Sequence, residues 1–184
     1  MCLQSPMRHV FEAEQWLPFA PELVFAFFAN PQNLPPLMPG WQKARIEEVF
    51  FVAPPPPPPG SPARIATGAG TTMVLSFRAL PGLPFRIRWH ALIPEFAWND
   101  HFCDEQTAGP FHYWRHCHSV RAETRDGVPG SIVHDRVEYE FPGGPLGDLA
   151  NLLGGRLQMH HIFRTRHRKT AKLMPLYAER RARR

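Results

Sequence analysis

Hydrophobic and polar residues alternate along most of the first three quarters of the chain, and this period of two predicts β-strands. The clearest case lies at residues 86–93, where four apolar residues alternate with two arginines and a histidine. Clusters rich in Gly and Pro at residues 107–110 and 126–130 predict antiparallel connections. The pattern predicts strands at residues 9–16, 43–52, 71–79, 86–93, 98–105, 113–124 and 131–141.

Apolar residues recur at helical spacing in two other regions. Residues 21–29 carry two apolar pairs at i, i+4 spacing, begin with Pro21 and Glu22, and stop before Asn30 and Pro31. Residues 33–38 predict a second short helix. The longest helix is expected at residues 146–173, with Gly154 and Gly155 weakening or kinking it. This order of elements predicts an α+β fold.

The composition fits a single globular domain. The chain has 184 residues, of which 43% are hydrophobic, 20% charged and 12% aromatic. Much of the net charge of +5 lies between Arg164 and Arg184. We attribute it to one helix face and a tail, and expect no nucleic-acid partner. The expected boundaries are a domain at residues 1–177 and a basic, disordered tail at 178–184.

Three cysteines, Cys2, Cys103 and Cys117, form no CxxC pair. Their odd number argues against a disulfide framework. We find no signal peptide and no apolar run long enough to span a bilayer. A cytoplasmic location is therefore expected.

Strand alternation places four ionisable side chains on the inner face of the sheet, among large aromatic rings: Asp104, His116, His118 and Asp135. Burying such groups costs several kcal/mol unless they are paired. If the hairpin centres on residues 109–110, Asp104 lies opposite His116. The same register sets Cys103 against Cys117 on the outer face. A slip of one residue would exchange the faces.

Three interpretations of these residues remain open. An Asp–His hydrogen bond could be purely structural, the group could form the polar end of a ligand pocket, or a histidine could act as a general base held by a carboxylate. A metal site is conceivable, but no further ligand pattern supports one. We expect no metal and no cofactor, since GxGxxG, P-loop, GxSxG and HExxH motifs are missing.

The six prolines of residues 54–59 have two interpretations. A stiff polyproline II segment could dock in an aromatic groove of a partner. Alternatively, the run is a long loop between two strands, because proline cannot sit inside a strand ladder. We expect the loop.

Two phrases carry a resemblance to a known family. PELVFAFFANPQNL at residues 21–34 resembles the first helical region of the START-related, polyketide cyclase/dehydrase-like superfamily (SRPBCC). FCDEQ at 102–106, GPF at 109–111 and WRHCH at 114–118, followed by Asp135, Val137 and Tyr139, look like one bacterial branch of it. The similarity covers roughly residues 8–175. It implies a helix-grip fold: a curved seven-strand antiparallel sheet around a long C-terminal helix, with two short helices closing one end.

The resemblance also implies an apolar cavity, but it supplies no catalytic residue. We therefore expect a module that binds a small hydrophobic or aromatic molecule. The alternative is a cyclase- or dehydratase-like enzyme using Asp104, His116 and His118 as acid and base groups. An interaction module using the proline loop is a third class. The expected ligand-binding residues are Met73, Leu75, Phe77, Trp89, Phe102, Asp104, Trp114, His116, His118, Asp135 and Tyr139.

Overall fold

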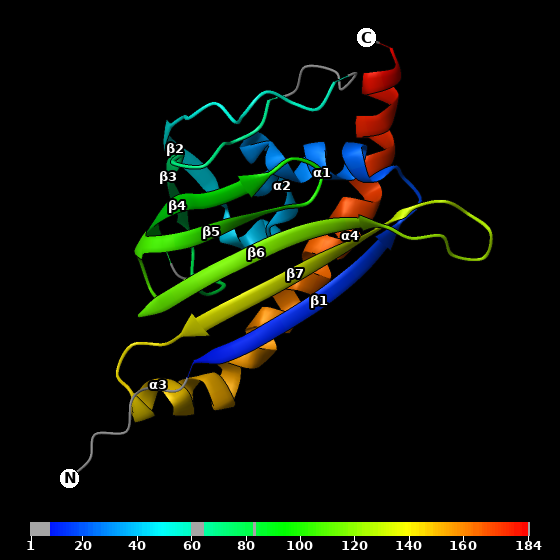
Figure 1. Cartoon of the computed structure of the whole chain (residues 1–184). Helices are drawn as coiled ribbons and strands as arrows, with labels where there is room; N and C mark the ends of the chain where they lie inside the picture. The colour runs from blue at the N-terminus through cyan, green and yellow to red at the C-terminus, as the bar shows by residue number, and fades with distance from the viewer. Residues whose placement is uncertain (1–7, 60–64, 83, 184) are drawn as a thin grey trace.

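The computed structural model describes residues 8–59, 65–82 and 84–183. Its centre is one seven-stranded antiparallel sheet in the order β1-β7-β6-β5-β4-β3-β2 (Figure 1). This is the sheet that the sequence predicts. The strands are β1 (His9–Leu17), β2 (Arg45–Phe50), β3 (Thr72–Phe77), β4 (Ile87–Ala97), β5 (His101–Ala108), β6 (Tyr113–Ala122) and β7 (Ser131–Glu140).

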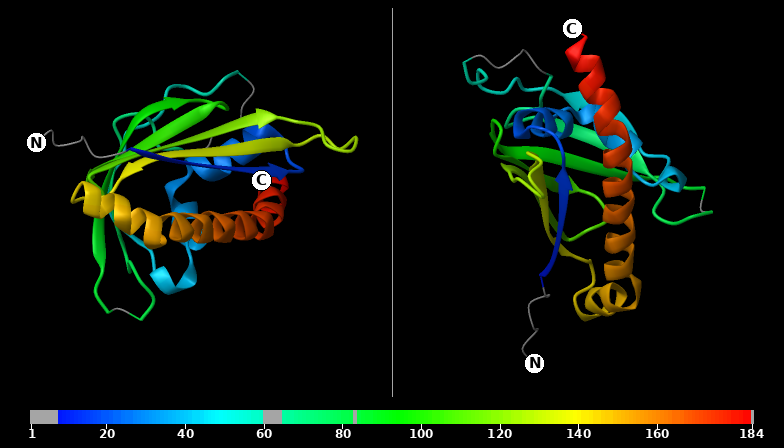
Figure 2. Two further views of the ribbon diagram at one scale, coloured as in Figure 1. Left: turned by 90° about the horizontal axis from the view of Figure 1, so that it is seen from below. Right: turned by 90° about the vertical axis from the view of Figure 1, so that its right-hand side faces the viewer.

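The sheet curves around the C-terminal helix α4 (Arg156–Ala182), which lies across its inner face (Figure 2). Two short helices, α1 (Pro21–Ala29) and α2 (Leu34–Leu37), pack near the C-terminal part of α4. A further short helix, α3 (Pro145–Ala150), precedes α4 at the other end. These elements form the helix-grip fold. No helix among the described residues is long and apolar enough to cross a membrane.

The predicted long helix is divided near its start. A π-helical turn at Asn151–Gly155 joins α3 to α4, and the chain bends there (Figure 1). A Cβ atom on Gly155 would lie 2.7 Å from a ring carbon of Phe141, so the glycine permits this close approach. The glycine pair thus marks a real irregularity, as the sequence indicates.

Helix α4 also extends further than expected. It continues past Pro175 to Ala182, where the sequence suggested an end near residue 173 and a disordered tail from 178. Met174 is fully buried and the Tyr177 ring packs edge-on against Phe27 of α1. We attribute the longer helix to this packing, which holds the turns around Pro175 against the core.

Strand boundaries differ most around β4 and β5. Strand β4 runs through Pro94, and the pairing with β5 shifts register between Leu92 and Glu95. Because proline donates no ladder hydrogen bond, it is tolerated where the register shifts. Trp98, expected in a strand, lies in the following turn, and β5 starts at His101. The proline run falls in the connection between β2 and β3, as predicted; residues 60–64 of that connection lie outside the described residues.

The β5–β6 hairpin has the predicted register. Asp104 lies opposite His116, Phe102 opposite His118, and Cys103 opposite Cys117. The two cysteines form a disulfide, with Cα atoms 4.1 Å apart. The odd number of cysteines argued against a disulfide framework, and the Cys103–Cys117 bond corrects that prediction for this pair. The count of three cysteines was misleading. Cys103 and Cys117 lie directly opposite one another on paired strands, so their sulfur atoms meet whether or not a third cysteine is present. Disulfides are uncommon in reducing compartments, so this bond does not favour the expected cytoplasmic location.

Loss of the disulfide is expected to destabilise the protein. It closes a loop with a sequence separation of 14 residues, so Cys103→Ser should lower the free energy of unfolding by about 2–4 kcal/mol. Urea titration of the oxidised protein measures the difference. Wild type treated with a thiol reductant should fall to the level of the variant. Equal stability of the oxidised and reduced wild type would contradict the prediction.

Candidate functional site

A cavity of about 290 Å³ lies between the sheet and α4. Its walls come from β3, β4, β5, β6, the α2 region and the inner side of α4, and most of them are apolar. Eight of the eleven residues expected to contact a ligand line it: Met73, Leu75, Phe77, Trp89, Phe102, Asp104, Trp114 and His116.

The other three expected residues do not line the cavity. Tyr139 is buried and donates its hydroxyl to Asn151 Oδ1 at 2.9 Å. His118 lies behind the wall, with the centre of its ring 4.1 Å from the centre of the Phe28 ring and the two ring planes tilted by 49°. Asp135 sits between His116 and His118 on the neighbouring strand. Strand alternation identifies the inner face but not which inner residues border empty space.

Sequence reasoning missed the part of the wall that α4 supplies. Met159, Ile162, Phe163 and Arg166 line the cavity at i, i+3, i+4 and i+7 spacing, which is one face of a helix. This periodicity was visible in the sequence. The sequence did not show that this face of α4 points toward the cavity, because the face that α4 presents depends on how the sheet curves around it. The connection after β5 and the end of β7 add Phe111 and Phe141.

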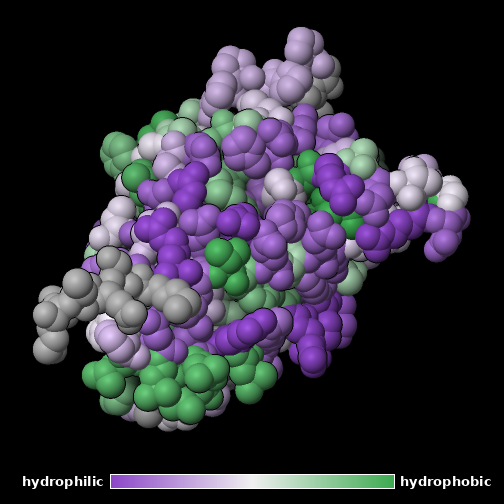
Figure 3. Space-filling view, turned by 60° about the horizontal axis from the view of Figure 1, so that its bottom comes forward, coloured by the Kyte–Doolittle hydropathy of each residue, from purple (hydrophilic) through white to green (hydrophobic). Residues whose placement is uncertain are grey.

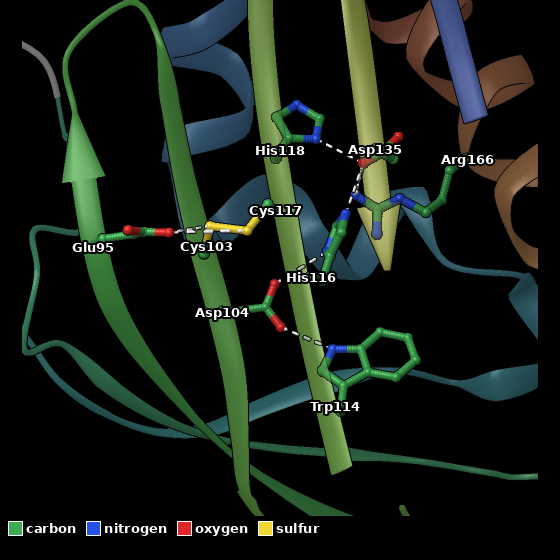
Figure 4. A network of polar contacts seen from close by, with 9 residues as sticks. All are labelled: Glu95, Cys103, Asp104, Trp114, His116, Cys117, His118, Asp135 and Arg166. Carbon is green, nitrogen blue, oxygen red and sulfur yellow. Dashed lines mark hydrogen bonds and ion pairs between the residues drawn. A yellow bond between two sulfur atoms is a disulfide. The ribbon is translucent and has the colours of Figure 1, made fainter. Parts of the chain in front are cut away.

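A chain of hydrogen bonds crosses the polar side of the cavity (Figure 4). The Asp104 carboxylate accepts from Trp114 Nε1 at 3.1 Å and from His116 Nδ1 at 3.1 Å. His116 Nε2 donates to Asp135 Oδ1 at 2.8 Å. Asp104 is the partly exposed end of this chain, and Asp135 is the buried end.

His116 is held as an imidazolium. Each of its ring nitrogens faces a carboxylate oxygen, so both must carry a proton to donate. Burial on its own would lower the pKa of His116, but the hydrogen bonds and charges of Asp104 and Asp135 raise it to about 9. Both nitrogens are thereby occupied, and His116 has no lone pair with which to accept a proton from a ligand.

His118 is in the opposite state. Its Nδ1 donates to Asp135 Oδ1 at 2.7 Å, while its buried Nε2 has no hydrogen-bond partner. Burial lowers the pKa of His118, and the positive charges of His116 and Arg166 act in the same direction, although Asp135 opposes them. The neutral ring leaves Nε2 unprotonated, which avoids burying a charged donor without a partner.

The Asp135 carboxylate on β7 is close to basic side chains of helix α4. Its Oδ1 lies 3.9 Å from a guanidinium nitrogen of Arg166, and its Oδ2 lies 3.8 Å from His167 Nε2. Burial would raise the pKa of this carboxyl, but the neighbouring His118 and His116 imidazoles hold it well below its usual range. Arg166 also lines the cavity, with its guanidinium 5.0 Å from the centre of the Phe163 ring.

The donor set of His116, His118 and Asp135 has the composition of a metal site, with its donor atoms within 4.8 Å of one another. Here those atoms bind one another through hydrogen bonds. An ion would have to displace both bonds beside the Arg166 cation. A second group, Glu95 with Cys103 and Cys117, lies on the outer face, but its sulfurs are joined in the disulfide. Neither donor set fits an ion in this state, and the absence of a metal stays a prediction.

A curved antiparallel sheet that wraps around a long helix and encloses an apolar cavity with it is the architecture of the helix-grip fold. No protein-family model matches the sequence, and no curated protein matches it either. Solved structures do resemble it. The truncated norcoclaurine synthase of Thalictrum flavum aligns with a TM-score of 0.60 and 13% identity, covering 92% of this chain and 94% of that one.

Two further structures have the same architecture. The protein TTHA0849 from Thermus thermophilus aligns with a TM-score of 0.59 and 18% identity, covering 91% of this chain and 98% of the other. Major latex-like protein 151 from Panax ginseng aligns with a TM-score of 0.52 and 11% identity, covering 90% of this chain and 96% of the other. At these identities the likeness establishes the fold, which confirms the expected helix grip. The bacterial branch stays a prediction.

The His116 imidazolium makes stability depend on pH. Its pKa is about 9 in the folded protein, above the value of 6.5 expected when unfolded, so its contribution is complete below pH 6.5. It is lost as pH rises through about 9. We expect the free energy of unfolding to fall by about 3 kcal/mol across this window, measured by urea titration. The fall should be absent from His116→Gln; the same slope in that variant would contradict the assignment.

Asp135 and Asp104 should differ in structural importance. Asp135→Asn leaves His116 and Arg166 facing a neutral group inside the protein, and should lower the free energy of unfolding by about 3–5 kcal/mol. Asp104 is partly exposed, so the matched change Asp104→Asn should cost clearly less. Thermal or urea denaturation of the two variants under the same conditions gives the comparison. Equal losses would contradict the roles derived from the geometry.

Proposed function

We propose that the protein binds a small hydrophobic or aromatic molecule in the cavity between the sheet and α4. The observation that carries the proposal is the cavity itself, whose volume of about 290 Å³ is lined mainly by apolar and aromatic side chains. Pockets for small molecules start at about 300 Å³ and combine such walls with a few polar groups. The helix-grip fold supports the same conclusion without naming a ligand.

The polar wall indicates what one end of the ligand carries. Asp104 presents a carboxylate, which accepts hydrogen bonds, and Arg166 presents a guanidinium, which only donates them. His116 lies between them with both ring nitrogens already engaged. The ligand proposed here has an apolar or aromatic body and a single polar end that meets Asp104 or Arg166.

An enzyme of the cyclase or dehydratase type is the second candidate, and the Asp104 carboxylate at the cavity wall favours it. The geometry narrows the residues that could do its chemistry. His118 does not reach the cavity, and His116 already carries its proton, so Asp104 is the group that could accept one from a substrate. Chemical conversion of a bound compound, abolished by Asp104→Asn, distinguishes catalysis from binding; dehydration lowers the mass of the compound by one water, and cyclisation without loss of water changes its chromatographic retention.

Filling the cavity should abolish binding. Leu75 lines the cavity, whereas Val74, the next residue in β3, does not. Leu75→Trp is expected to weaken binding of a hydrophobic fluorescent probe by at least about tenfold, since the added ring occupies the space of the ligand. Val74→Trp introduces the same indole ring on the other side of the strand and should bind as wild type. Probe titration, together with native mass spectrometry for co-purified ligand, measures both.

Two results would count against the proposal. One is the absence of both a co-purified ligand and any probe binding to wild type. The other is probe binding that Leu75→Trp leaves intact, because the probe would then bind elsewhere. Far-ultraviolet circular dichroism and thermal denaturation of both tryptophan variants check that they are folded.

A further inference from the structure

A concentrated apolar surface lies at the end of the molecule where α3 turns into α4. Five leucines between residues 146 and 157 expose about half to four fifths of their area: Leu146, Leu149, Leu152, Leu153 and Leu157. We call these five residues the leucine patch. Figure 3 shows the corresponding apolar surface at the bottom of the molecule, bordered by hydrophilic residues. Exposed apolar surface gathered in this way marks an interaction site on a soluble domain.

The surface next to the leucine patch is cationic. Arg156, His160, Arg164, Arg168 and Lys172 follow one another at i+4 spacing along α4, and all five are exposed. No Asp or Glu occurs between residues 149 and 178. Arg156 and Arg164 are the arginines of this row nearest to the leucines in sequence. An apolar surface with arginines beside it is complementary to an anionic surface that has an apolar interior.

The patch also adjoins the cavity. Gly155 and Gln158, in and just after the same turn, line the cavity, and Gln158 Nε2 donates to the backbone oxygen of Ala79 at 3.2 Å. The next residue, Leu80, lines the cavity and is itself half exposed. The apolar lining therefore reaches the molecular surface beside the leucine patch.

We propose that the leucine patch and the arginines beside it dock this protein on a membrane surface that contains anionic phospholipids. The leucines enter the boundary between headgroups and acyl chains, and Arg156 and Arg164 contact lipid phosphates. A second copy of the chain fits the patch less well, because pairing two patches would bring two cationic rims together. The docking does not depend on the identity of the cavity ligand.

Vesicle flotation tests the docking. Full-length protein is mixed with vesicles of phosphatidylcholine alone or of phosphatidylcholine with phosphatidylglycerol, and the bound fraction gives a partition coefficient. Binding is expected to the mixed vesicles and to be much weaker with phosphatidylcholine alone. Combining Leu152→Ser with Leu153→Ser should reduce the coefficient by at least about tenfold. Combining Arg156→Gln with Arg164→Gln should reduce it by about fivefold for each arginine.

The far end of α4 supplies matched controls. Leu176 is also half exposed, and Arg180 is exposed, yet Arg180 lies about 36 Å along the helix from Arg156. Leu176→Ser and Arg180→Gln should therefore bind vesicles as wild type. All the substituted side chains are exposed or half exposed, and unchanged circular dichroism confirms that the variants are folded.

Three results would overturn the proposal: no binding to mixed vesicles, binding that the leucine pair leaves unchanged, or equal binding to neutral vesicles. Analytical ultracentrifugation tests whether the protein self-associates through the leucine patch. A dimer that disappears in the Leu152 and Leu153 double variant, without vesicle binding by wild type, would assign the patch to a second copy instead. The probe titration of the cavity should be unaffected by these surface variants, so the two proposals can fail separately.

Discussion

The arrangement of the inner face depends on a single buried carboxylate. Asp135 on β7 is nearly inaccessible to water, and its cost of burial must be offset by neighbours that carry or donate protons. His116 and His118 on β6 donate hydrogen bonds to it, and the Arg166 cation on α4 lies 3.9 Å away. One charge therefore connects the adjacent strands β6 and β7 to helix α4, and it sets the protonation of the His116 and His118 imidazoles.

The need of the buried Asp135 carboxylate for a charged partner explains why one edge of the cavity is polar while the rest is apolar. His116 is protonated because it lies between two carboxylates, and Asp104 is the second of them. Because Asp135 is paired with the His116 imidazolium, a second negative charge is needed beside that ring. Asp104 supplies it, and its carboxylate also lines the cavity. The polar group that a ligand would meet is thus the outer end of a chain that starts in the core.

The sequence predicts the sheet well because alternation with a period of two is a local property. The opposition of Asp104 and His116 followed from placing the hairpin turn at residues 109–110, and the structure has that register. The positions of His118, Tyr139 and Asp135 relative to the cavity could not be predicted in the same way. They depend on sheet curvature, on Phe28 covering His118, and on the face that α4 presents, which are long-range properties.

The Cys103–Cys117 disulfide fixes the strand register that brings Asp104 and His116 together. Cys103 and Cys117 are the residues next to Asp104 and His116 on the same two strands, so the bond joins the hairpin one position away from the polar pair. A slip of one residue would place outward-facing side chains in the cavity wall and move Asp104 out of it. The cross-link excludes such a slip. It therefore holds the Asp104–His116 hydrogen bond at the edge of the cavity.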